Sequence, residues 1–202
     1  MMRVRRHLVA AIAVLCLSHT AALAGAKPSM LPAELNDPTL NVLRELEEQP
    51  MWPKAPGKAV TRYRLSLIGI NCRLHTIRFD ESPDGDVRGQ AKVWDRCRHD
   101  NYYDAQDFHL PRVRFALIKA AMVKAGLWQR PASYWAAQDP DSICLDGTDV
   151  IFERRDAQDF RMDQANVWCS TTRDYVIAAR MLLIAADDRA GLALLPEIEN
   201  AR

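Results

Sequence analysis

The segment from residue 99 to residue 109 holds the densest group of side chains able to do chemistry. Its two histidines, His99 and His109, enclose several aspartates, Asp104 among them. Two imidazole nitrogens and a carboxylate can bind a metal, and a histidine oriented by a carboxylate can act as a general base. The spacing matches no known ligand motif. The same acids would also favour the N-terminus of a following helix, so the segment predicts a solvated loop.

A second group of candidates is aromatic and lies between residues 127 and 142. Trp128, Tyr134 and Trp135 are interleaved there with proline and glutamine. Rings of this kind can stack on sugars or peptides, although in such segments they more often anchor a loop to the core. They are the candidate binding residues that the sequence offers.

The known catalytic signatures are missing from the sequence. It has no nucleophile elbow, zinc-protease motif or glycine-rich phosphate loop, and it has only 8 glycines. The sequence therefore predicts no cofactor and no metal site, and it favours a binding protein over an enzyme. The alternative is a small exported hydrolase that uses His99, Asp104 and His109, with or without a metal.

The chain has 5 cysteines, and the four that lie outside residues 1–24 form two equally spaced pairs, 25 positions apart in each case: Cys72 with Cys97, and Cys144 with Cys169. This spacing differs from the close cysteine pairs of zinc sites, and an even number of cysteines in an exported chain indicates disulfides. We predict the bonds Cys72–Cys97 and Cys144–Cys169.

Each pair encloses a polar turn near its midpoint, which favours a β-hairpin with the cysteines nearly opposite each other. The first turn contains Pro83-Asp84-Gly85 and the second spans residues 154–159. Pro-Asp-Gly also favours a three-residue loop, which would centre the hairpin on Asp84 and put its cysteines one residue out of register.

Residues 1–24 have the pattern of a signal peptide. Three arginines precede an apolar stretch from Leu8 to Leu17, and Ala22-Leu23-Ala24 resembles a cleavage site. The sequence thus predicts a periplasmic or secreted protein without a membrane span after signal removal. The remaining residues carry 24 basic and 26 acidic side chains, so nothing indicates binding to nucleic acid.

Residues 25–58 are predicted to form an N-terminal helix and a proline-rich linker, and residues 59–202 a single α+β domain. The domain is predicted to contain two β-β-α repeats, at residues 59–126 and 143–191. Together they would form a mainly antiparallel four-stranded sheet with two helices on one face. The predicted strands lie near residues 61–79, 87–96, 143–153 and 160–169, and the predicted helices span residues 111–125 and 172–190.

These features together predict an exported binding or interaction module. Its partner would be an envelope protein, with an inhibitor role or a cell-wall ligand as further options. The ligand, the partner's identity and the oligomeric state cannot be deduced from the sequence.

Overall fold

The computed structural model describes residues 43–49, 51, 60–69, 73–97, 99, 102–129, 148–166 and 173–190. The predicted signal peptide lies outside the described residues, as do Cys72, Cys144 and Cys169. Cys97 is described and is disulfide-bonded. The two predicted pairings therefore stay predictions.

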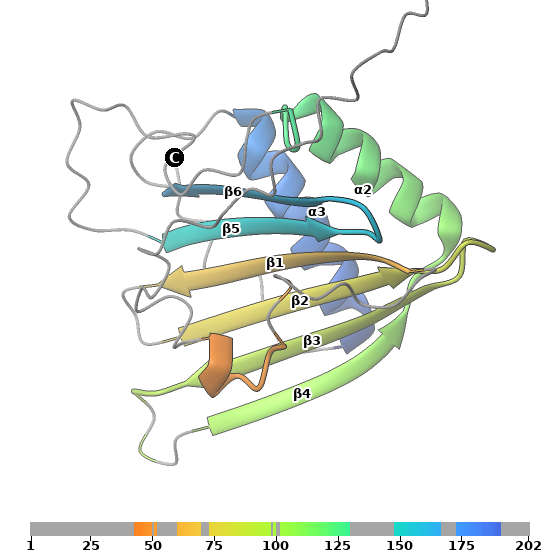
Figure 1. The fold of residues 1–202 in the computed structure, drawn as a ribbon. Helices are drawn as coiled ribbons and strands as arrows, with labels where there is room; N and C mark the ends of the chain where they lie inside the picture. The colour runs from red at the N-terminus through yellow and green to blue at the C-terminus, as the bar shows by residue number, and fades with distance from the viewer. Residues whose placement is uncertain are drawn as a thin grey trace, which may run out of the picture.

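Six strands form one antiparallel sheet in the order β4-β3-β2-β1-β5-β6 (Figure 1). The first of the described strands, β1, lies in the interior of this sheet and pairs with both β2 and β5. The strands are β1 (Thr61–Gly69), β2 (Arg73–Glu81), β3 (Val87–Asp95), β4 (Tyr102–His109), β5 (Thr148–Arg155) and β6 (Phe160–Asn166).

The predicted four-stranded sheet of two β-β-α repeats is wrong. The sequence predicts a single strand near residues 61–79, but this range contains β1 and most of β2. The sequence predicts a loop over residues 99–109, but residues 102–109 form β4. Because β4 is an edge strand, it contributes little to the core beyond Phe108, and its sequence lacks the alternation of a half-buried strand.

The turn between β2 and β3 has the three-residue geometry that Pro-Asp-Gly favours. The Gly85 N–H donates to Ser82 O over 2.8 Å, the Ser82 N–H donates to Asp86 O over 3.0 Å, and Gly85 has a φ of 84°. The ladder closes with Glu81 opposite Val87, so the hairpin is centred on Asp84. The second hairpin closes with Arg155 opposite Phe160, one position later than the midpoint of its cysteines.

Two helices, α2 (Arg112–Lys124) and α3 (Arg173–Ala190), lie against the same face of the sheet (Figure 1). None of the described helices is long and apolar enough to span a bilayer. Helix α2 ends in a Schellman motif, in which the Leu127 N–H donates to Met122 O over 3.1 Å. Gly126 provides the left-handed residue, with a φ of 75°.

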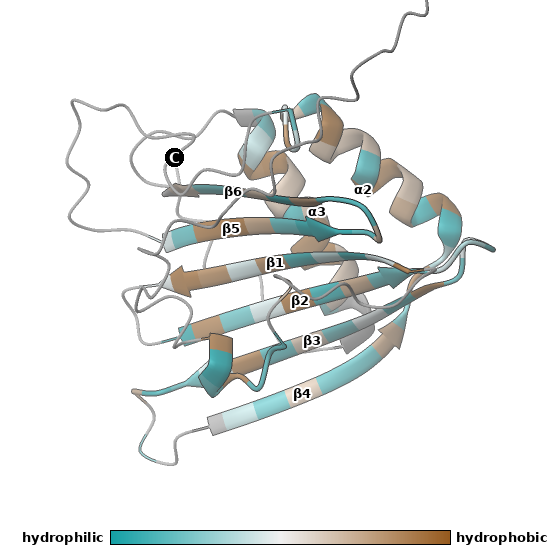
Figure 2. Cartoon of the chain, viewed as in Figure 1, coloured by the Kyte–Doolittle hydropathy of each residue, from teal (hydrophilic) through white to brown (hydrophobic). Residues whose placement is uncertain are grey.

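The hydrophobic core lies between these helices and the sheet. Phe115 of α2 contacts Tyr63 and Phe79, with ring centroids 5.3 Å apart in both cases. Tyr175 of α3 packs edge-on against Phe152 and donates a hydrogen bond to Val150 O over 3.0 Å. Hydrophobic and hydrophilic residues alternate along the central strands (Figure 2), which leaves the opposite face of the sheet polar.

Candidate functional site

The face of the sheet turned away from the helices carries an unusual number of charged side chains for its depth of burial. Arg64, Lys92 and Glu153 are all buried on it, and Arg78 is half-buried. Burying a charged side chain destabilises the folded state unless the charge is paired and hydrogen-bonded. The next question is therefore which partners stabilise these buried charges.

Residues 43–49, called the covering segment below, lie on this polar face (Figure 1). The segment begins as a helix and ends in a Schellman motif, in which the Glu48 N–H donates to Leu43 O over 2.9 Å. Its left-handed position is occupied by Glu47, with a φ of 53°. Leu46 packs against Leu74 and the partly buried Ile68 and Trp94.

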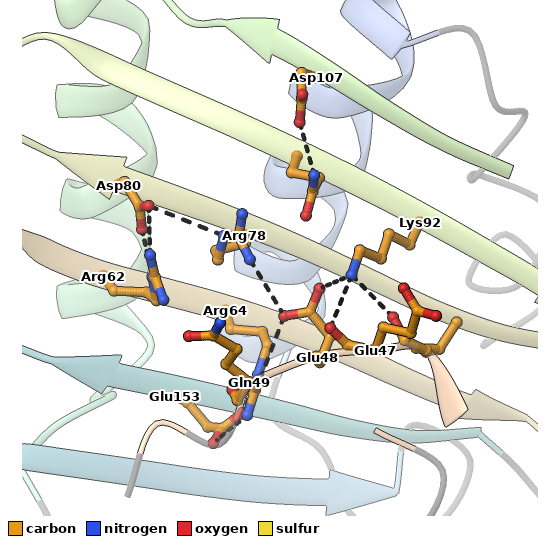
Figure 3. Close-up of polar contacts among 12 residues, drawn as sticks. Glu47, Glu48, Gln49, Arg62, Arg64, Arg78, Asp80, Lys92, Asp107 and Glu153 are labelled. Atoms are coloured by element: carbon orange, nitrogen blue, oxygen red, sulfur yellow. Dashed lines mark hydrogen bonds and ion pairs between the residues drawn. The ribbon is translucent and has the colours of Figure 1, made fainter. Parts of the chain in front are cut away.

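Three cations from three adjacent strands converge on the carboxylate of Glu48 (Figure 3). The Lys92 Nζ atom lies 2.9 Å from Glu48 Oε1. Arg64 Nη1 lies 3.4 Å and Arg78 Nη1 lies 3.7 Å from Glu48 Oε2. The Glu48 side chain is only 2% exposed. The three cations therefore stabilise a carboxylate that is shielded from water.

The same cations also bind the main chain of the covering segment. Lys92 Nζ donates to Leu46 O over 2.9 Å and to Glu47 O over 3.3 Å, while Arg64 Nη1 donates to Gln49 O over 2.9 Å. Carbonyls at the end of a helix carry partial negative charge and lack partners within the helix. The polar face therefore recognises both an acidic side chain and a helix C-terminus.

Glu153 fixes the position of the Arg64 guanidinium. The two groups form a bidentate pair, with Nε to Oε2 at 2.5 Å and Nη2 to Oε1 at 2.8 Å. Burial alone would lower the pKa of Arg64, but the ion pair and hydrogen bond with Glu153, and then those with Glu48, outweigh it and raise the pKa. Arg64 therefore stays charged and oriented, and its Nη1 group is turned towards the covering segment.

The structure separates the histidines that the sequence grouped as candidates. His99 is exposed in the turn before β4, and His109 is the last residue of that strand. An eight-residue strand is roughly 25 Å long, so the two imidazoles lie at opposite ends of β4. His109 is 73% exposed and lies 3.8 Å from Asp86, while Asp104 lies within β4, opposite Val93.

The aromatic candidates can be placed only in part. The Trp128 side chain packs against the hydrophobic core, and the Trp128 backbone N–H donates to Asp163 Oδ2 over 3.1 Å. Its backbone is also left-handed, with a φ of 75°, four positions after the last residue of α2. Trp128 thus acts as a loop anchor, whereas Tyr134 and Trp135 lie outside the described residues.

Sequence reasoning missed Glu48, Arg64, Arg78 and Lys92. A signal for part of this set was present, because Arg62, Arg64 and Ser66 alternate with apolar residues along β1 and so mark a polar face. Nothing in the local sequence shows that a segment ahead of β1 covers that face.

In the part of the chain that the structure describes, no group of three or more histidine, cysteine or acidic side chains is arranged to hold a metal ion. No protein-family model matches the chain, and a search of curated proteins finds no significant match. The assignment of a function therefore depends on the geometry of the polar face.

Proposed function

We propose that this protein is a small exported binding module, whose polar sheet face binds an acidic segment at the end of a helix in an envelope protein partner. The observation that carries the proposal is the convergence of Arg64, Arg78 and Lys92 on one carboxylate. In this interpretation, Glu48 and the covering segment occupy the binding face in cis.

The contacts of the covering segment indicate what the partner segment must offer. It needs an apolar side chain in the place of Leu46 and a carboxylate in the place of Glu48. It also needs free carbonyl groups at a helix end for Lys92. An amphipathic helix that ends in acidic residues meets all three requirements.

Peptide binding tests the proposal. The probe is a fluorescent peptide with the sequence of residues 40–51, and the host is the full chain carrying Glu48→Ala, in which the cis segment is weakened. Because the competing carboxylate is gone, the peptide should bind the host about tenfold more tightly than the unaltered protein. Fluorescence anisotropy measures both affinities.

Two matched variants of the host separate recognition from general charge attraction. Arg78→Met removes one of the three converging cations and should weaken binding. Arg88→Met removes an exposed cation that pairs with Asp86 instead, and it should leave binding unchanged. The proposal fails if the host does not bind the peptide, or if a peptide with lysine in place of Glu48 binds equally well.

A further inference from the structure

The two edges of the sheet differ in their exposure to solvent. Strand β4 forms one edge and β6 forms the other (Figure 1). In an antiparallel ladder, alternate residues of an edge strand direct their main-chain N–H and C=O groups towards the neighbouring strand. The residues between them, called the outward residues below, direct these groups away from the sheet.

The outward residues of β4 follow from the hydrogen bond at its end. The Leu110 N–H donates to Val87 O over 3.1 Å, so this pair is hydrogen-bonded. Because the register between β3 and β4 is continuous, every second residue before Leu110 bonds to β3 in the same way. The residues between them are the outward ones, and all four are exposed: Tyr103, Ala105, Asp107 and His109.

The outward residues of β6 are buried instead. The Asp156 N–H donates to Asp159 O over 3.1 Å, so the alternation along β6 makes residues 160, 162 and 164 the outward ones. Phe160, Met162 and Gln164 are 3%, 6% and 1% exposed. The sheet is therefore shielded at β6, whereas the outward residues of β4 face solvent.

Strand β4 also lacks several features that keep exposed edges from pairing with another strand. Residues 102–109 contain no proline or lysine, and their register with β3 runs without a bulge. Asp104 and Asp107 are its two acids, and they restrict the choice of partner, because like charges directly opposite each other destabilise a strand pair.

We propose that β4 pairs antiparallel with β4 of a second copy of this chain, which joins two six-stranded sheets into one. Main-chain hydrogen bonds require outward residues to lie opposite outward residues. One register pairs all four of them. It sets Tyr103 opposite the second copy's His109, and Ala105 opposite the second copy's Asp107.

This register makes β4 complementary to itself. Asp107 lies opposite an alanine and Asp104 lies opposite the second copy's Phe108, so no two acids face each other. Tyr103 and His109 form a cross-strand ring pair at each end of the new ladder. The contact is isologous and therefore closes at two copies. Its two-fold axis is perpendicular to the sheet, so both polar faces lie on the same side of the dimer.

Sedimentation velocity of the full chain tests the pairing and does not depend on the proposed function. A single strand pair is a small interface, so we expect a dissociation constant on the order of 10 µM, within a concentration series from about 1 to 200 µM. A chain that stays monomeric throughout this series would overturn the inference.

Two variants at Ala105 test whether the main chain of β4 forms the contact. Ala105→Pro removes an outward N–H but no bond to β3, so the monomer should keep its circular dichroism spectrum while dimerisation weakens more than about tenfold. Ala105→Thr keeps the N–H and should dimerise as the original chain does. A folded Ala105→Pro protein with unchanged dimerisation would show that the copies meet elsewhere.

Two double variants test the register through exposed side chains. Tyr103→Lys with His109→Lys sets like charges opposite each other twice in the dimer and should weaken it about tenfold. Tyr103→Lys with His109→Glu sets opposite charges there and should restore the dimer. Equal dissociation constants for the two double variants would mean that these residues are not opposite each other and that the register is wrong.

Discussion

The helix-side face of the sheet is closed by aromatic and aliphatic packing, whereas the opposite face is closed by ion pairs and by hydrogen bonds to main-chain oxygens. Phe79 and Phe115 meet on the first face through ring contacts alone. On the second face, Lys92 makes three polar contacts to the covering segment. Apolar packing accepts any side chains of suitable volume, while charges and hydrogen bonds demand particular groups at particular places. The polar face is therefore the one that can select a partner by its sequence.

The largest expected effect comes from removing the central cation of the polar face. Arg64→Met should lower the free energy of unfolding by about 3–5 kcal/mol, because Glu153 would be left buried without its partner. Urea unfolding measures the loss. Arg64→Met with Glu153→Leu should recover much of it, since apolar side chains can replace a buried ion pair. An Arg64→Met protein within 1 kcal/mol of the original would mean that the polar face contributes no more than a surface salt bridge.

His75 is buried on the helix-side face, opposite Leu67, and its titration should report how far that face is shielded from water. Burial, followed by repulsion from Arg73, lowers the pKa of His75 from 6.5 to about 4, although Asp95 opposes this shift. Protonation thus favours the unfolded chain. The contribution is fully present above pH 6.5 and is lost as the pH falls towards 4, to a total of about 3 kcal/mol.

Chemical unfolding of the original protein and of a His75→Leu variant between pH 7 and pH 4 measures this dependence. The variant should lose less stability over that range. Identical slopes for the two proteins would show that another group causes the acid sensitivity.

The smallest expected effect compares the two Schellman motifs, one on each side of the sheet. Glu47 is left-handed without being glycine, so Glu47→Gly should raise the free energy of unfolding by about 0.5–1 kcal/mol. The reciprocal change Gly126→Ala should lower it by about 1 kcal/mol. A Cβ atom at Gly126 would meet nothing within 4 Å, so only backbone strain would contribute. Thermal unfolding tests both variants, and a destabilising Glu47→Gly would contradict the strain argument.

Local sequence predicted the elements that have strong local signals. The helix from Pro111 to Ala125 agrees with α2 because Phe115, Ile118 and Met122 keep helical spacing and Gly126 ends the pattern. Strand β4 was missed because it lies at a sheet edge and presents polar residues on both faces. The equal spacing of the cysteines suggested a duplication, but β1 and β4 have no counterparts among the described residues of the second half.

The candidate site was harder to predict than the fold because it depends on contacts between distant parts of the chain. Glu48 is 16 positions from Arg64, and Glu153 is 89 positions from it. The polar alternation along β1 would suit a solvent-exposed face equally well. Among the described residues, it is the covering segment that lies over the charged part of that face, and its position on the sheet has no local signature.

The interior position of β1 has a consequence for the order in which the chain can fold. During N-to-C synthesis, β2, β3 and β4 become available soon after β1, and their antiparallel ladders close over short separations. The other edge of β1 pairs with β5, where Leu65 faces Phe152, so that ladder must wait for a closure of more than 80 residues. A nascent chain that stops before residue 148 would therefore expose the edge of an interior strand, and the C-terminal hairpin completes the sheet.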